Sequence, residues 1–85
     1  MMKIKYFITP QCNTCHALEP RARQLAERYQ IPFETIDLAA NEDLKGKYLL
    51  FTAPALMFLD DDKEIKRFVR NFGLHEVEAF IQRIV

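Results

Sequence analysis

The chain has 85 residues, and its 12 basic and 12 acidic side chains cancel to a formal net charge of zero. This length fits one domain, residues 1–85, and a neutral chain has no electrostatic reason to bind nucleic acid or a membrane surface. The hydrophobic share of 49%, with only two glycines, excludes a disordered or low-complexity segment. The sequence shows no apolar run of membrane-spanning length and no export signal, so we expect a cytoplasmic protein, and a monomer.

The first half of the chain predicts a strand, a helix and a second strand. Residues 2–9 (MKIKYFIT) are rich in β-branched and aromatic residues, and Pro10 ends this strand. Apolar residues at helical spacing predict a helix over residues 12–29, which Pro20 should either bend or divide into two short helices. Residues 33–38 (FETIDL) predict the next strand.

The second half predicts a short helix, two strands and a last helix. Asn41 is the expected N-cap of the short helix, which continues through Tyr48 and as far as Phe51. The apolar run of residues 55–59 (ALMFL) indicates a buried central strand. Residues 64–69 then pair with it as a hairpin, and residues 74–84 form an amphipathic helix. The element order predicts an α/β fold whose first two strands are parallel.

The segment most informative about function is residues 9–16 (TPQCNTCH), where a strand ends and a helix begins. A helix N-terminus offers free N–H groups and the positive end of the helix dipole. Both should lower the pKa of Cys12 from about 8.5 toward about 7 or less, which favours the nucleophilic thiolate. Cys15 lies one turn further on the same helix face. The spacing therefore predicts Cys12 as the attacking sulfur and Cys15 as the resolving sulfur.

Other interpretations of the two cysteines have weaker support. Buried structural cysteines fit poorly with a polar helix start. A zinc site would have to combine Cys12 and Cys15 with His16 or the distant His75, whereas structural zinc sites use separated ligand pairs. The C-x-x-C-H pattern also matches covalent haem attachment, which requires export. We therefore expect no metal and no organic cofactor. His16 is either a solvated flank of the helix, which we favour, or a local cation or proton relay that supports the Cys12 thiolate.

Taken together, these features resemble the thioredoxin superfamily, at the size of a glutaredoxin. The resemblance extends over nearly the whole chain. It is carried by the strand directly before Cys12 and Cys15, by residues 52–54 (Thr-Ala-Pro) before an apolar strand, by Gly73 before the last helix, and by Pro20 within the first helix.

The resemblance implies a thioredoxin-like fold, in which a four-stranded mixed sheet with its first and third strands central is flanked by three helices. It also implies that Pro54 is cis and lies against the cysteine pair. The backbone of Ala53 is then expected to pair with an extended stretch of substrate. Pro10 and Gln11, which directly precede Cys12, are further expected substrate-binding residues.

Three features depart from the usual patterns of the superfamily. Asn13 and Thr14 replace both the Gly-Pro usual in thioredoxins and the Pro-Tyr usual in glutaredoxins. Residues 6–8 (YFI) contain no counterpart of the buried Asp that thioredoxins carry on the strand before the motif. Residues 70–73 (RNFG) lack the Gly-Gly-Asp-like turn with which glutaredoxins bind glutathione.

We predict a thiol–disulfide oxidoreductase that reduces protein disulfides through a reversible Cys12–Cys15 dithiol/disulfide. Its partners would be protein disulfide substrates and an unidentified reductase or glutathione. The alternatives are a glutathione-coupled glutaredoxin and a non-catalytic thioredoxin-like module that binds a partner or senses redox state.

Overall fold

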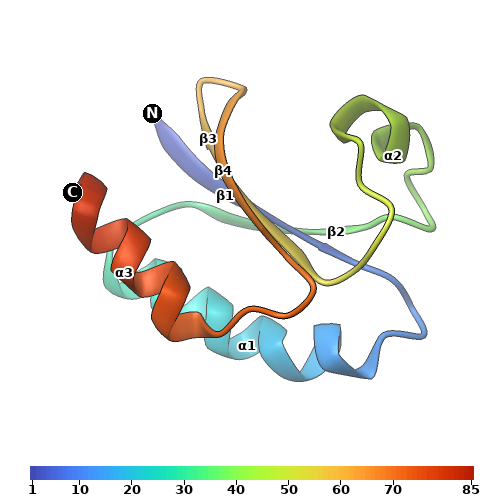
Figure 1. The fold of residues 1–85 in the computed structure, drawn as a ribbon, viewed down its shortest axis with the longest axis horizontal. Helices are drawn as coiled ribbons and strands as arrows, with labels where there is room; N and C mark the ends of the chain where they lie inside the picture. Colours follow the sequence, from blue (N-terminus) through green and yellow to red (C-terminus); the bar gives the residue numbers. More distant parts are fainter.

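A computed structural model describes residues 1–85. The predicted order of elements is confirmed: β1 (Met2–Ile8), α1 (Asn13–Arg28), β2 (Phe33–Asp37), α2 (Asp43–Tyr48), β3 (Ala55–Asp60), β4 (Lys63–Val69) and α3 (Leu74–Ile84). The strands form one sheet in the order β2-β1-β3-β4 (Figure 1). β1 and β2 are parallel, and the other neighbouring pairs are antiparallel. The mixed sheet with β1 and β3 central is therefore as expected.

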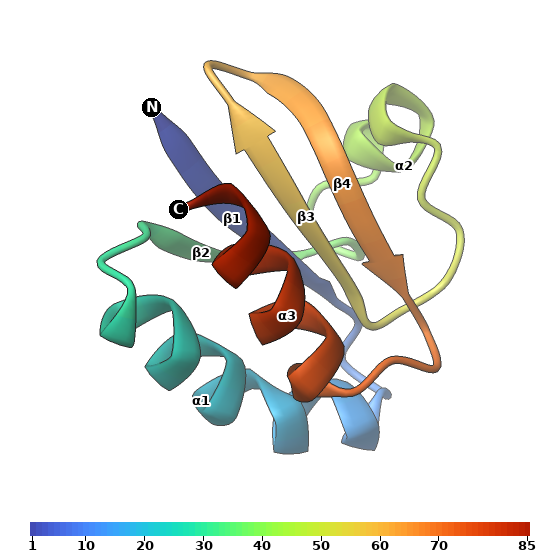
Figure 2. The same ribbon diagram turned by 60° about the vertical axis from the view of Figure 1, so that its left-hand side comes forward.

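The helices cover both faces of the sheet. α1 and α3 lie side by side on one face, and α2 lies on the other (Figures 1 and 2). Successive side chains of a strand point to opposite faces, so each central strand contributes to both sides. Tyr6 and Leu56 belong to the apolar cluster beneath α1 and α3, whereas Phe7 and Met57 belong to the cluster beneath α2. No helix of the chain has the length and apolar character needed to cross a membrane.

Helix α1 is a single helix, so of the two alternatives for Pro20 the division into two short helices is wrong. Proline removes only one main-chain hydrogen bond of the helix. The buried side chains of Ala22, Leu25 and Ala26 hold the segment after Pro20 in the larger apolar cluster, which explains why the helix continues. The helix begins after Cys12, whose backbone is extended, and not at Cys12 as predicted.

Helix α2 is short and lacks the predicted cap. It begins at Asp43, so the assignment of Asn41 as N-cap is wrong. The side chain of Asn41 instead donates a hydrogen bond from Nδ2 to the carbonyl oxygen of Asp37 at 3.0 Å, which commits it to the turn after β2. The helix ends at Tyr48 because Leu49 adopts a left-handed backbone with φ 54°. Phe51, expected in the helix, lies outside it and is 74% exposed.

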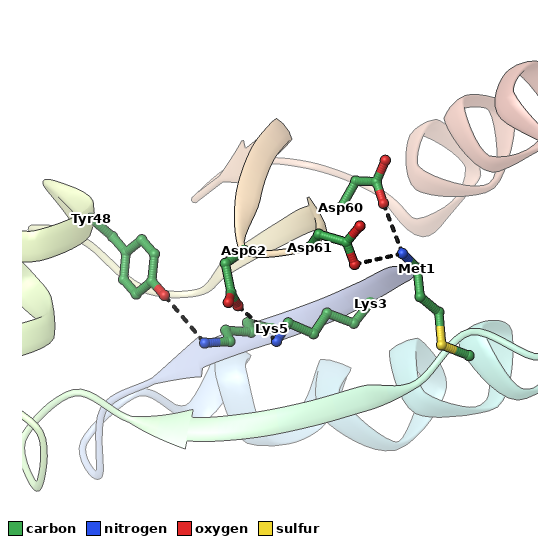
Figure 3. A network of polar contacts seen from close by, with 7 residues as sticks. All are labelled: Met1, Lys3, Lys5, Tyr48, Asp60, Asp61 and Asp62. Carbon is green, nitrogen blue, oxygen red and sulfur yellow. Dashed lines mark hydrogen bonds and ion pairs between the residues drawn. The ribbon is translucent and has the colours of Figure 1, made fainter.

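Helix α2 contacts the sheet through Leu44 and Tyr48, which pack on the smaller apolar cluster. The Tyr48 ring lies 5.7 Å from the ring of Phe7, centroid to centroid. The Tyr48 hydroxyl accepts a hydrogen bond from Lys5 Nζ at 3.2 Å (Figure 3).

Exposed polar contacts join the N-terminal end of β1 to the turn between β3 and β4. The amino group of Met1 lies 3.0 Å from an Asp60 carboxylate oxygen and 2.8 Å from one of Asp61, and Lys3 Nζ lies 3.1 Å from Asp62 (Figure 3). Asp61 and Asp62 form the turn between β3 and β4, and both have positive φ. Solvent screens ion pairs as exposed as these, so they add little to the stability of the fold.

Candidate active site

The two cysteines lie where β1 passes into α1, at the end of the sheet opposite the N-terminus. A tight turn follows β1, and the Cys12 N–H closes it by donating to the carbonyl oxygen of Thr9 at 3.2 Å. Cys12 is the N-cap of α1, and Cys15 lies in its first turn. The two side chains form a disulfide, with their Cα atoms 5.2 Å apart. The first turn of the helix therefore brings the pair together, as the spacing predicted.

The environments of the two sulfurs differ in the way that the sequence indicated. The Cys12 sulfur accepts a hydrogen bond from the Cys15 N–H at 3.1 Å and is partly exposed. The same contact, together with the helix dipole, would stabilise a thiolate at Cys12. Cys15 is completely buried. An external sulfur therefore has access to Cys12 and not to Cys15.

A tyrosine from β1 lies directly beneath the cysteine pair. The Tyr6 hydroxyl donates a hydrogen bond to the carbonyl oxygen of Cys15 at 2.8 Å. Tyr6 is fully buried, and burial raises the pKa of its phenol to about 12, with the Glu19 carboxylate adding to the effect. The phenol therefore stays protonated at neutral pH and keeps its proton available for this bond.

The loop before β3 lies at the same end of the sheet as the cysteines (Figures 1 and 2). The peptide bond between Ala53 and Pro54 is cis, as the resemblance implies. Pro54 is buried, and its carbonyl oxygen accepts a hydrogen bond from the Arg70 N–H at 2.8 Å. The next residue, Ala55, pairs with Phe7 on β1, so this loop begins β3 beside the strand that leads to Cys12.

Comparison with known proteins identifies the family. The family model described as thioredoxin matches residues 2–83. Thioredoxin 1 of Thermosipho africanus TCF52B superposes with a TM-score of 0.91 and is 39% identical, over 96% of this chain and 92% of that one. The chain belongs to the thioredoxin family. It is also 36% identical to thioredoxin H7 of Arabidopsis thaliana over 64 residues, which are 74% of this chain but only 50% of the plant protein.

A more distant structure has the same architecture. Fasciola hepatica thioredoxin superposes with a TM-score of 0.85 at 25% identity, over 96% of this chain and 79% of that one. In this thioredoxin-family chain, the Cys12–Cys15 disulfide is the redox-active group expected of a thiol–disulfide oxidoreductase. The chain spans half the length of the plant relative.

The remaining predicted substrate-binding residues, Pro10 and Gln11, lie beside the cysteines, as does His16, whereas Gly73 lies at the start of α3. Pro10 and Gln11 are exposed in the turn before Cys12. His16 is also exposed, and its Nε2 lies 3.3 Å from the Pro10 carbonyl oxygen, which agrees with its interpretation as a flank of the helix. Gly73 is the N-cap of α3 and has an extended backbone.

The histidine considered for zinc lies elsewhere in the fold. His75 lines an open groove of about 310 Å³ between α1 and α3, together with Arg21, Arg28 and Glu78. No group of three or more His, Cys, Asp or Glu side chains lies close enough together to hold a metal ion.

The polar contacts between α1 and the sheet were not predicted from the sequence. The Glu19 carboxylate accepts hydrogen bonds from the Thr35 hydroxyl and from the Arg23 guanidinium, each at 2.7 Å. These bonds lower the pKa of Glu19. The spacing of Glu19 and Arg23 at i and i+4 could have indicated their ion pair. The contacts of Thr35 and Tyr6 with the helix depend on tertiary structure, and no local pattern indicates them.

Proposed function

We propose that this chain is an enzyme that reduces protein disulfides with its Cys12–Cys15 dithiol. The observation that carries the proposal is the difference between the two cysteines: Cys12 is partly exposed and its sulfur accepts the Cys15 N–H at the start of α1, whereas Cys15 is buried. A helix start lowers the pKa of a cysteine and so supplies the nucleophilic thiolate at neutral pH.

The reaction proceeds in two exchange steps. The Cys12 thiolate attacks a substrate disulfide, forms a mixed disulfide and releases one substrate thiolate, which takes up a proton. Cys15 then loses its proton and attacks the Cys12 sulfur, so that the Cys12–Cys15 disulfide closes and the second substrate thiol leaves. Two electrons pass from the dithiol to the substrate, and no other cofactor takes part.

The loop before β3 supports a site for an extended substrate segment. Ala53 is partly exposed, and neither its N–H nor its C=O is hydrogen-bonded within the chain. Free main-chain groups of this kind can pair with an incoming strand. We assign Ala53 and Pro54 to one side of the substrate site, and the exposed Pro10 and Gln11 to the other.

A reductase would return the disulfide to the dithiol. One structure of this fold, a thioredoxin f2 at 21% identity, is a complex with ferredoxin:thioredoxin reductase. For this chain we propose a protein reductase as electron donor and the cytoplasm as its location. We expect the reduction potential of the Cys12–Cys15 pair to lie near the roughly −270 mV of thioredoxin. Glutathione is the competing donor, and reduction of a small glutathione mixed disulfide at the expense of glutathione would favour it.

The test is reduction of insulin disulfides by dithiothreitol. We expect the wild-type chain to accelerate it and Cys12→Ser to abolish the acceleration. When dithiothreitol is left out, reduced Cys15→Ser should accumulate a mixed disulfide with insulin, because the second step is lost. A wild-type chain that folds and cycles between dithiol and disulfide, yet does not accelerate insulin reduction, would contradict the proposal. That result would favour a binding or redox-sensing module.

A further inference from the structure

Two hydroxyl groups hold the first two turns of α1 against the sheet. The parallel register pairs Tyr6 of β1 with Thr35 of β2, so both hydroxyls lie under the same helix. Tyr6 donates to the carbonyl oxygen of Cys15 at 2.8 Å, and Thr35 donates to the carboxylate of Glu19 at 2.7 Å. Cys15 and Glu19 are four residues apart, one helical turn. Each strand therefore fixes one turn, and only the Tyr6 contact reaches a cysteine.

We propose that Tyr6 is a positioning residue that holds Cys15 for the step in which the Cys12–Cys15 disulfide closes. The inference rests on the proposed function, because it concerns the second of the two exchange steps. The Tyr6 hydroxyl acts on the backbone of Cys15 and forms no hydrogen bond to either sulfur.

The contact is built to persist. Tyr6 is fully buried, and its ring is stacked on that of Phe33, with centroids 5.8 Å apart and planes inclined by 30°. The packing of the ring therefore keeps the hydroxyl at the Cys15 carbonyl oxygen. Breaking the bond would leave a buried hydroxyl without a partner, which is unfavourable. Because the phenol stays protonated at neutral pH, it keeps its proton for donation to the Cys15 carbonyl oxygen.

The closing step depends on where Cys15 is held. In that step the Cys15 thiol gives up its proton, its sulfur forms a bond to the Cys12 sulfur, and the bond from Cys12 to the substrate sulfur breaks. The proton is taken up by the departing substrate thiolate. Attack is fast only when the reacting atoms are held in place, and here the two Cα atoms lie 5.2 Å apart. A first turn that is free to shift spends less time in this arrangement, so the disulfide closes more slowly and is less stable.

The test compares two variants that each lose one hydroxyl. Tyr6→Phe removes the contact to Cys15 and keeps the ring. Thr35→Val is the matched control, since it removes the neighbouring contact to Glu19 and leaves Cys15 untouched. Each reduced protein is mixed with excess 5,5′-dithiobis(2-nitrobenzoate), and release of the thionitrobenzoate anion is followed in a stopped-flow instrument. The first phase reports attack by Cys12, and the second reports closure by Cys15.

We expect Tyr6→Phe to slow the second phase about two- to tenfold, the range that one neutral hydrogen bond represents, with the first phase unchanged. We also expect the equilibrium constant for forming the Cys12–Cys15 disulfide, measured against dithiothreitol, to fall by up to about tenfold. This corresponds to a rise of up to about 30 mV in the reduction potential of the pair. Thr35→Val should match the wild-type chain in both. Wild-type values in Tyr6→Phe would overturn the proposal. Equal slowing in both variants would also overturn it, because the cause would then be general loosening of α1.

A measurement on the wild-type chain keeps the proposal testable even if Tyr6→Phe does not fold. The hydroxyl proton of Tyr6 should give a slowly exchanging NMR resonance in both the disulfide and the dithiol forms. Free exchange in the dithiol form would overturn the proposal. The stopped-flow reagent is a small aromatic disulfide, so the closing step can be measured even if protein disulfides are not substrates and the proposed function fails.

Discussion

At the scale of single residues, the two cysteines differ in exposure and in hydrogen bonding. Cys12 accepts the Cys15 N–H at 3.1 Å. We predict that in a Cys15→Ser variant the Cys12 thiol titrates below the free-thiol pKa of about 8.5, because the amide and the helix dipole stabilise the thiolate. Thiolate absorbance followed against pH measures this, with Cys12→Ser as control. Cys15 in that control is buried and should titrate at higher pH than Cys12. A Cys12 midpoint at or above about 8.5 would show that the helix start does not activate this sulfur.

The geometry of the cysteine pair could be predicted because the features that create it are local. A strand, a proline turn and a helix start all lie within a few residues of Cys12 in the sequence. Tyr6 could not be assigned in the same way. Its place under Cys15 depends on how α1 docks on the sheet and on the register of β1 with β2, which pairs it with Thr35. The prediction for Asn41 was wrong for a different reason. Asparagine is a favoured N-cap, but here its side chain is bonded to the Asp37 carbonyl oxygen instead.

At the scale of elements, α1 is joined to β2 through the Glu19 carboxylate. The hydrogen bonds from Thr35 and Arg23 lower the pKa of Glu19. A carboxyl group whose pKa is lowered by folding stabilises the fold above its unfolded pKa of about 4.3, and this contribution is lost as the pH falls through the folded pKa. We predict that Glu19→Gln is less stable than wild type at pH 7 and that the difference shrinks in acid.

Urea unfolding at neutral pH and in acid measures the effect. Glu27→Gln is the matched control, because Glu27 is an exposed carboxylate of the same helix that forms no ion pair. The control should stay close to wild type at both pH values. A destabilisation of Glu19→Gln that is the same at neutral and acid pH would contradict the prediction.

The end of α1 offers a second prediction at this scale. Gln30 has φ 57°, and the hydrogen bonds of Gln30 N–H to the Glu27 carbonyl and of Ile31 N–H to the Ala26 carbonyl close a Schellman motif. Glycine is favoured at this left-handed position because a Cβ is strained there. We predict that Gln30→Gly raises the free energy of unfolding by about 1 kcal/mol, measured in urea. Gln30→Ala retains a Cβ and should gain nothing, and an equal gain in both variants would contradict the explanation.

At the scale of the whole molecule, stability depends on the two apolar clusters on either side of the sheet. Phe58 is fully buried in the larger cluster, with its ring 4.9 Å from that of Phe80. Removing such a ring costs about 3–5 kcal/mol, against a total of about 4–13 kcal/mol for a domain of this size. We predict that Phe58→Ala loses much of its cooperative thermal transition. Phe51→Ala, at a site that is 74% exposed, should change the free energy of unfolding by less than about 0.5 kcal/mol. Similar losses in the two variants would contradict this picture.

The arrangement of these clusters was also the best predicted part of the fold. The continuous apolar run of β3 indicated a buried central strand, and the resemblance to the thioredoxin superfamily implied that β1 is central as well. Both strands are central. The limits of α2 were predicted less well. Leu44 and Tyr48 are the only apolar side chains of this helix that pack on the sheet, so local backbone geometry at Leu49 decides where it ends. Packing thus determines the strongly apolar elements, and local hydrogen bonds determine the weakly packed ones.

The position of β4 at the edge of the sheet has a consequence for the behaviour of concentrated protein. The outer edge of β4 presents unpaired main-chain donors and acceptors, which can pair with the edge strand of a second molecule. Ile65 and Val69 of the same strand are exposed and would favour such edge-to-edge association. Lys66 is the middle residue of this strand. If two copies joined edge to edge over the full antiparallel strand, their Lys66 ammonium groups would face each other across the new ladder and repel. A single charge in the middle of the strand thus opposes the aggregation that its apolar neighbours would otherwise favour.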